Sequence, residues 1–122
     1  MKKLLSILIV VFFLSAVPAY CGDEWTTEDT QIQAALLFIK GIDWLQTKEI
    51  ARNPDYYEIN PILGKYPSQN QVDAYFLCSA IGHTVVAYYL PKKYRRIWQY
   101  VFIGISTGLV CHNYNAGIRI NF

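Results

Sequence analysis

Two long stretches without a charged residue constrain what this chain can fold into more than any other feature. Residues 74–90 and residues 97–117 contain no Lys, Arg, Asp or Glu, and the basic segment 92–96 lies between them. A helix that crosses a bilayer needs about 20 predominantly apolar residues, with about 17 as the lower limit. The pattern therefore predicts a transmembrane hairpin with helices over about 72–90 and 97–115, joined by a short basic turn.

The composition favours the same class of protein. Hydrophobic residues make up 53% of the 122 residues and charged residues only 16%, whereas about 25% are charged in ordinary domains. A chain of this length has room for one domain, which we place at residues 20–122. The net charge of +2 is too small to indicate a nucleic-acid partner. The three cysteines show no CxxC spacing that would indicate a zinc or redox site.

The amino terminus has the pattern of a secretory signal peptide. Two lysines precede the apolar segment 4–17, and Val17 and Ala19 offer small residues for cleavage after Ala19. We therefore predict a signal peptide over residues 1–19, with an uncleaved membrane anchor as the alternative. The acidic segment 22–29 that follows is typical of a solvated mature start, so we favour cleavage.

A helix is predicted over about residues 28–52. Thr26 and its neighbours are N-cap residues followed by acidic side chains. The helix must stop before Pro54, because a residue that precedes proline avoids the helical region. Its apolar core of about 12 residues is short for a membrane span, and Lys40 and Asp43 interrupt it. We expect this helix to lie at the membrane interface.

The distribution of positive charge orients these elements. Lys and Arg are retained on the cytoplasmic side of a membrane. The basic turn 92–96 should then face the cytoplasm, while the mature amino-terminal segment and the carboxyl terminus face the periplasm. The predicted fold is an all-α membrane protein of the bacterial inner membrane. A signal segment, one interfacial helix and a two-helix transmembrane hairpin make up its three-helix bundle.

Asp43 lies on an apolar stripe of the predicted helix 28–52, with Thr47 one turn further on. A carboxylate on such a stripe is costly unless it has a partner. Two interpretations remain open. Asp43 pairs with Lys40, three residues earlier, at a wet edge, or it points into a polar pocket shared with the hairpin.

The segment 53–70 contains one local motif, Glu58-x-Asn60-Pro61-x-x-Gly64. Side chains alternate along an extended segment, so Glu58 and Asn60 would face the same side and contribute to a site. An ordinary turn built from the same residues is the alternative.

The two predicted membrane helices carry residues suited to close packing. Gly104 and Gly108 form a GxxxG spacing, which lets helix backbones approach closely, and Ser79 and Ala80 lie on the facing helix. An antiparallel hairpin places His83 level with Gly104. This level is near the middle of the predicted membrane span, where an ionisable residue is a functional candidate. A neutral histidine that only hydrogen-bonds a neighbouring helix is the alternative.

Cys78 and Cys111 would lie at similar depth in this hairpin, toward its outer end. The outer side of the inner membrane is oxidising. A disulfide is therefore one interpretation, and two buried free thiols are the other, which we favour.

The polar residues that could converge at the outer mouth of the hairpin form a candidate site: Asp43, Thr47, Glu58, Asn60, His83, His112 and Asn113. Carboxylates and imidazoles together can bind a metal or pass protons. Asp43, Glu58 and His83 are the candidate ligands of a divalent metal, although we predict no cofactor. No HExxH, GxSxG or phosphate-loop motif is present, so a protein that is not an enzyme is favoured.

The run Asp43-Trp44-Leu45-Gln46-Thr47, the Glu58-x-Asn60-Pro61 loop and the later polar residue His83 resemble small, uncharacterised bacterial, sometimes phage-borne, membrane proteins. Those proteins share an Asp…Thr helix, a Glu-x-Asn-Pro loop and a polar residue within the membrane. The likeness covers most of residues 31–117. It implies a membrane location and the same candidate residues, and it brings no established activity.

Three functions remain open. The first is a structural or partner-binding component of the cell envelope that contacts the lipid bilayer and packs against itself or a larger membrane protein. The GxxxG spacing and the aromatic residues near the ends of the apolar stretches favour it. The second is a metal- or proton-handling membrane site that uses Asp43, Glu58 and His83. The third, indicated only by size and topology, is a phage-type membrane or lysis accessory.

Overall fold

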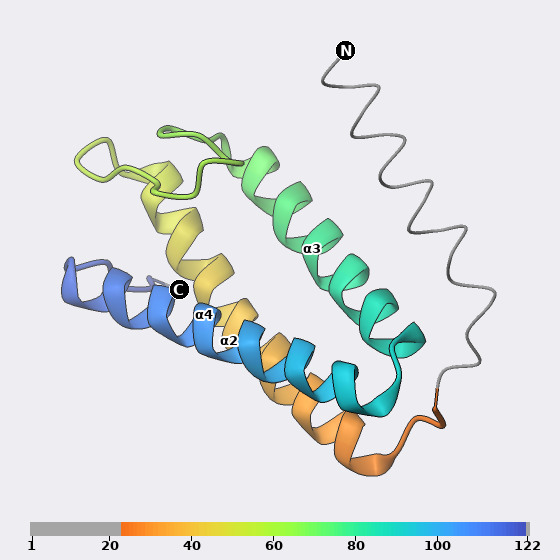
Figure 1. Cartoon of the computed structure of the whole chain (residues 1–122). Helices are drawn as coiled ribbons and strands as arrows, with labels where there is room; N and C mark the ends of the chain where they lie inside the picture. Colours follow the sequence, from red (N-terminus) through yellow and green to blue (C-terminus); the bar gives the residue numbers. More distant parts are fainter. Residues whose placement is uncertain (1–22, 122) are drawn as a thin grey trace.

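The computed structural model describes residues 23–121, which form three α-helices (Figure 1). These are α2 (Thr27–Arg52), α3 (Gln69–Tyr89) and α4 (Lys92–Asn115), and the described residues contain no strand. The predicted all-α architecture with three helices is confirmed. The predicted signal peptide over residues 1–19, and Cys21, lie outside the described part of the chain.

Local sequence signals set the ends of α2. Thr26 and Asp29 form a capping box in which the Thr26 hydroxyl accepts from the Asp29 amide (3.2 Å) and the Asp29 carboxylate accepts from the Thr26 amide (2.9 Å). These bonds satisfy amides that a helix start otherwise leaves unpaired. The helix ends at Arg52 because Asn53 precedes Pro54 and is extended. The predicted bounds of this helix are therefore confirmed.

The break between α3 and α4 is shorter than predicted. A Ser68–Gln71 capping box starts α3, and the helix ends at Tyr89 because Leu90 precedes Pro91 and is extended. α4 begins at Lys92, so the segment 92–96, predicted as a basic turn, is the first turn of a helix. Lys and Arg are good helix formers, and Leu90 and Pro91 alone are enough to reverse the chain.

A Schellman motif ends α4. Gly117 has a φ of +89°, its amide donates to the Tyr114 carbonyl, and the next amide, of Ile118, donates to the Asn113 carbonyl. Ile118 then lies buried against the bundle. The turn also binds the connection between α2 and α3, because the Tyr56 hydroxyl donates to the Gly117 carbonyl (3.3 Å).

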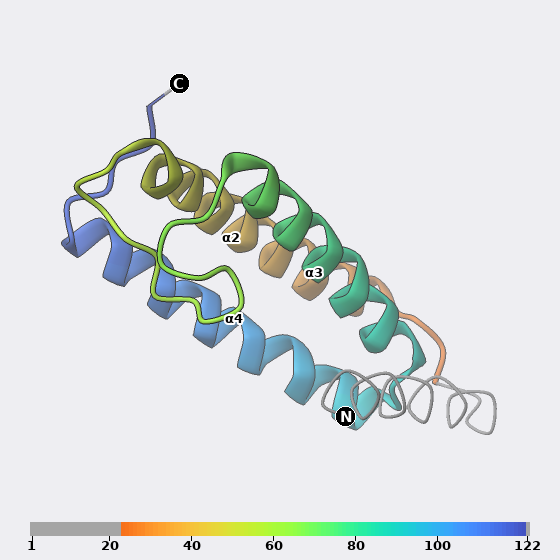
Figure 2. The same ribbon diagram turned by 90° about the horizontal axis from the view of Figure 1, so that it is seen from above.

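α2 is the central helix, and α3 and α4 both pack mainly against it. Figure 1 shows α3 and α4 diverging from their short turn, and Figure 2 shows the connection 53–68 at the opposite end, extending from α2 toward α4. The predicted close packing of α3 on α4 through small residues is wrong. Gly104 and Gly108 are exposed, and a Cβ atom on either would meet nothing within 4 Å.

Within residues 23–121, no helix is both long and apolar enough to cross a membrane. This finding overturns the predicted transmembrane helices at 72–90 and 97–115, and with them the predicted inner-membrane topology. The prediction failed because a stretch without charge is not necessarily apolar. Ser79 and His83 lower the hydropathy of residues 74–90, as Gln99 and Asn113 lower that of residues 97–117.

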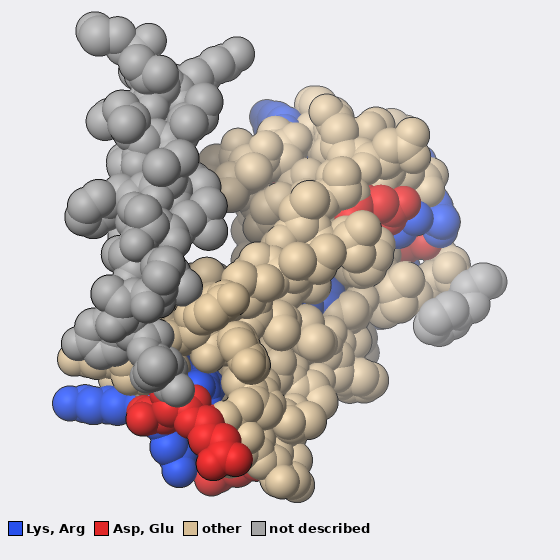
Figure 3. Space-filling view, turned by 90° about the vertical axis from the view of Figure 1, so that its right-hand side faces the viewer, with Lys and Arg blue, Asp and Glu red and all other residues tan. Residues whose placement is uncertain are grey.

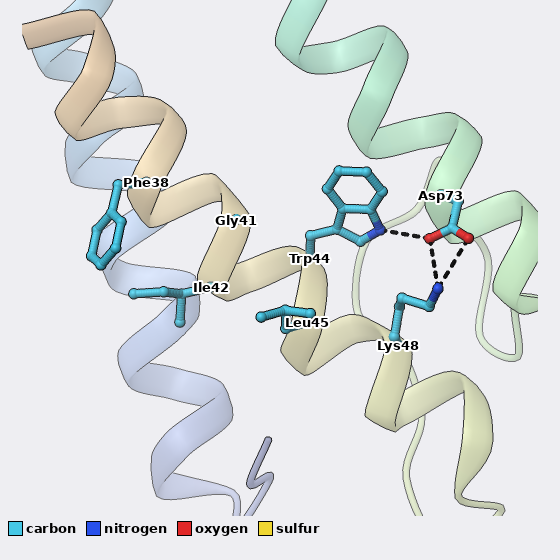
Figure 4. A pocket seen from close by; sticks show the side chains of 7 residues that line it. All are labelled: Phe38, Gly41, Ile42, Trp44, Leu45, Lys48 and Asp73. Carbon is cyan, nitrogen blue, oxygen red and sulfur yellow. Dashed lines mark hydrogen bonds and ion pairs between the residues drawn. The ribbon is translucent and has the colours of Figure 1, made fainter. Parts of the chain in front are cut away.

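Charged side chains gather at separate places on the face shown in Figure 3, with a broad uncharged surface between them. An ion pair joins Lys48 of α2 to Asp73 of α3 (3.0 Å). Trp44 also donates to Asp73 (2.8 Å), as Figure 4 shows. These contacts fix the start of α3 against the second half of α2.

Candidate functional site

The interior of the described chain is mainly polar. Ten buried side chains are polar or charged: Asp29, Gln33, Asp43, Gln46, Thr47, His83, Arg95, Gln99, Ser106 and Asn113. Seven are hydrophobic: Ile32, Leu36, Ile50, Val72, Phe76, Ala87 and Ile118. Buried polar groups are stable only where they are hydrogen-bonded, so their partners define where a site can lie.

Most of these polar residues belong to two clusters at different levels of α2. The Arg95 cluster lies near the α3–α4 turn and consists of Asp29, Gln33, His83, Arg95, Arg96 and Gln99. The Asp43 cluster lies near the connection 53–68 and consists of Asp43, Gln46, Thr47, Asn113 and Glu58.

Arg95, which is completely buried, is the centre of the first cluster. A guanidinium has five N–H donors, and each has an acceptor here. They are the Asp29 carboxylate (2.7 Å) and the carbonyls of Asp23 (2.6 Å), Glu24 (3.2 Å), Ala87 (2.9 Å) and Tyr88 (3.4 Å). Arg95 therefore ties the segment before α2 to the end of α3.

Asp29 is the matching anion and is also fully buried. Burial by itself would raise the pKa of Asp29, but hydrogen bonds from the Thr26 backbone, from Arg96, from the Thr26 hydroxyl and from Arg95 hold that pKa well below its usual range. The donors lie 2.7–2.9 Å from its oxygens. Asp29 is ionised at neutral pH, and the pair is structural.

His83 belongs to this cluster and not to the Asp43 cluster. Its Nδ1 lies 3.3 Å from Gln33 Nε2, and its ring stacks on Trp98 and meets Phe102 edge-on. Burial, with a smaller contribution from the positive charge of Lys40, lowers the pKa of His83 to about 4. His83 is therefore neutral at pH 7. This agrees with the alternative in which the histidine only bonds a neighbouring helix.

Asp43 is buried, with 8% of its surface exposed. Its Oδ1 accepts from Asn113 (3.4 Å) and from Thr47 (3.5 Å), and Asn113 also donates to Gln46 (3.3 Å). Burial first, and repulsion by Glu58 second, raise the pKa of Asp43 to about 6. Of the two interpretations of Asp43, the polar pocket is the one observed, and Lys40 instead donates to Ser79 (2.9 Å).

The Glu58 motif folds as a compact turn. Glu58 Oε1 accepts from the amides of Ile59 (2.9 Å) and Asn60 (2.8 Å), and the Asn60 side chain accepts from Ile62 (2.9 Å). Gly64 has a φ of +78°, which favours glycine. Glu58 Oε2 is buried and has no hydrogen-bond partner among the described residues.

The structure thus brings together Asp43, Thr47 and Asn113, with Glu58 close enough for its charge to act on Asp43. The Asn60 side chain is used within its own turn, and His112 is exposed. Residues 23–121 contain no group of three His, Cys, Asp or Glu side chains arranged to hold a metal ion. Cys78 and Cys111 are free thiols as favoured, but they are exposed and not buried.

Sequence reasoning missed several residues that form the two clusters. Arg95 was predicted in a basic turn that faces the cytoplasm, and Asp29 only among the acidic residues at the start of a helix. Gln33, Gln46 and Gln99 carry no charge and were not among the candidate residues. A glutamine inside an apolar helix is nevertheless a sign of a buried polar contact.

A surface groove of about 470 Å³ lies along α2 (Figure 4). Phe38, Ile42 and Leu45 lie on one side of it, and Trp44, Lys48 and Asp73 on the other. It contains no member of either cluster, so it is separate from the candidate site.

Comparison of the chain with known protein families, curated proteins and solved structures finds no match.

Proposed function

We propose that this chain is a non-enzymatic helical subunit that associates with a second copy of itself through α4. The observation that carries the proposal is the apolar stripe formed by Ile97, Val101 and Ile105. These residues are spaced four apart and are 52%, 51% and 51% exposed. Residues at this spacing share one face of a helix, and a contiguous exposed apolar patch indicates an interaction site.

The chemistry of this face favours a second copy as the partner. α4 carries no Lys, Arg, Asp or Glu from Ile97 to Asn115, so a charged partner surface would bury charges without counterions. A second copy presents the same uncharged face. Most oligomers pair identical surfaces in this way around a two-fold axis.

The shape of the face also permits a close helix pair. Gly104 and Gly108 lie beside the stripe, and the space over both is open. Helix backbones can approach closely where glycines remove the side chains. The GxxxG spacing thus supports contact between two chains, because neither Gly104 nor Gly108 packs against α3 within one chain.

The exposed apolar area of α4 suits a small, reversible interface. Six large hydrophobic residues of α4 are exposed: Tyr94, Ile97, Tyr100, Val101, Ile105 and Tyr114. A half-exposed tyrosine can bury roughly 100 Å² more, and a half-exposed aliphatic side chain roughly 50 Å². The total is roughly 450 Å², about half of the roughly 800 Å² that one partner contributes to a standard interface, and this suits a dimer that dissociates on dilution.

Light scattering of the full chain over a dilution series tests this proposal. The wild type should show a dimer that dissociates on dilution. Ile105→Lys should be monomeric at the same concentrations, because two unpaired ammonium groups would be buried. Ile62→Lys, at a 77% exposed isoleucine of the connection, is the matched control and should dimerise like the wild type.

A wild-type chain that stays monomeric at all concentrations would overturn the proposal. If that monomer also floats with phosphatidylcholine vesicles, the apolar face binds a lipid surface and not a second copy. Equal weakening by Ile62→Lys and Ile105→Lys would equally exclude an interface specific to α4.

A further inference from the structure

Two buried aspartates of the same bundle are equipped very differently. Asp29 receives charged donors from Arg95 and Arg96 at 2.7 and 2.8 Å. Asp43 receives only neutral donors, from Asn113 and Thr47, at 3.4 and 3.5 Å. Hydrogen bonds to an ionised carboxylate are typically about 2.7–2.9 Å long. The surroundings of Asp43 therefore suit a neutral acid better than an anion.

The charged groups around Asp43 do not compensate for this. The connection 53–68 contributes Glu58, whose charge repels that of Asp43. On α2 itself Lys40 attracts, but its ammonium group is bonded to Ser79 of α3. α4 contributes the uncharged Asn113. No arginine or lysine contacts the Asp43 carboxylate among the described residues.

Glu58 gives a second, independent indication that a proton is needed here. One of its oxygens accepts two backbone amides, and the other, Oε2, is buried without any donor. A buried acceptor without a donor is destabilising. Protonation of Asp43 removes the repulsion between its charge and that of Glu58.

We propose that Asp43 is a proton-binding site that controls how the connection 53–68 rests on the bundle. With Asp43 protonated, the connection is held against α2 and α4. With Asp43 and Glu58 both ionised, their repulsion loosens it. The proton comes from solvent and returns to solvent, so no other ligand is required. This inference does not depend on the proposed dimer.

The direction of the effect follows from the environment of Asp43. With the connection held on the bundle, the pKa of Asp43 is about 6, which lies above the ordinary value of 3.8. The stabilisation is therefore present at acidic pH and is lost as pH rises through about 6. A fall of one unit in the pKa of Asp43 when the connection loosens corresponds to about a tenfold weakening of its contact with the bundle.

Amide hydrogen exchange of the full chain tests the proposal. After correction for intrinsic rates, the amides of Ile59, Asn60 and Gly64 should lose about tenfold or more protection between pH 5 and pH 8. In Asp43→Asn this pH dependence should disappear. Asp55→Asn removes an exposed carboxylate from the same connection and should behave like the wild type.

A pH dependence that persists in Asp43→Asn would overturn the proposal, as would its loss in Asp55→Asn. Should Asp43→Asn fail to fold, the carboxyl carbon of Asp43 can be titrated by NMR in the wild type. A midpoint near pH 6, lowered by Glu58→Gln, supports the proposal. A midpoint below about 4.5 refutes it.

Discussion

Arg95 shows how a single residue can organise a small bundle. Its five donors join the segment before α2, the first turn of α2 and the last turn of α3. A buried ion pair does not by itself add much stability, but removal of one partner leaves an uncompensated buried charge. The Asp29–Arg95 pair therefore makes the native arrangement specific at this end of the molecule.

At this scale we predict that Asp29→Ala lowers the free energy of unfolding by about 3–5 kcal/mol. Arg95 would lose its counterion while remaining buried. Urea denaturation at pH 7 measures the loss. Glu49→Ala, which removes the partner of the exposed Arg52, is the control and should change stability by less than about 1 kcal/mol. Comparable losses in both variants would show that the buried pair has no special role.

The same pair predicts how acid acts on the fold. The pKa of Asp29 is lowered, so its contribution is present above about pH 4 and is lost as pH falls below that value. Asp43 acts in the opposite direction, since its pKa is raised. Two buried aspartates of one chain thus respond oppositely to pH because one has arginine partners and the other has none.

At the scale of elements, short sequence signals decide where each helix starts and stops. Capping boxes start α2 and α3, prolines follow the ends of α2 and α3, and a Schellman turn ends α4. These signals act over four or five residues. The helix bounds are for that reason largely independent of the environment in which the bundle resides.

Two glycines test this local control. Gly117→Ala should lower the free energy of unfolding by about 1–2 kcal/mol, because an L-residue is strained in the left-handed region. Gly41→Ala, inside α2 with open space around the position, should raise it by up to about 1 kcal/mol, since alanine is the better helix former. Thermal or urea denaturation distinguishes the two signs, and a gain in Gly117→Ala would contradict this account of the turn.

At the scale of the whole molecule, polar side chains fill the interior while apolar side chains cover α3 and α4. An exterior of this kind is stable only when something covers it. The proposed α4 dimer covers part of it. The two free thiols, Cys78 on α3 and Cys111 on α4, report on which helix is covered.

Cys111 follows Gly104 and Gly108 at helical spacing, so it lies on the α4 face. We expect the rate of maleimide labelling at Cys111 to fall severalfold when the chain is concentrated into the dimer range. Cys78 should label at an unchanged rate and serves as the internal control. Mass spectrometry of the labelled peptides measures both rates. Protection of Cys78 with Cys111 unaffected would place the interface on α3.

The sequence by itself determined the three helices, most of their ends and part of the candidate site, whereas α3 and α4 both begin earlier than predicted. Helix ends depend on residues four or five positions apart, and Asp43 stood out because an acid on an apolar stripe is costly. Asp43, Thr47 and Asn113 do meet. His83 does not join them, because α3 and α4 diverge and its ring packs between Trp98 and Phe102 near the turn.

Only the tertiary structure decided which polar residues are paired and which apolar faces are left open. Asp29 and Arg95 are 66 residues apart, and Asp43 and Asn113 are 70 apart. No local pattern encodes contacts over such separations. Freedom from charge, which suggested two membrane spans, is a property of the sequence. The burial of glutamine, arginine and aspartate between helices, with isoleucine and tyrosine outside, depends on how the helices pack.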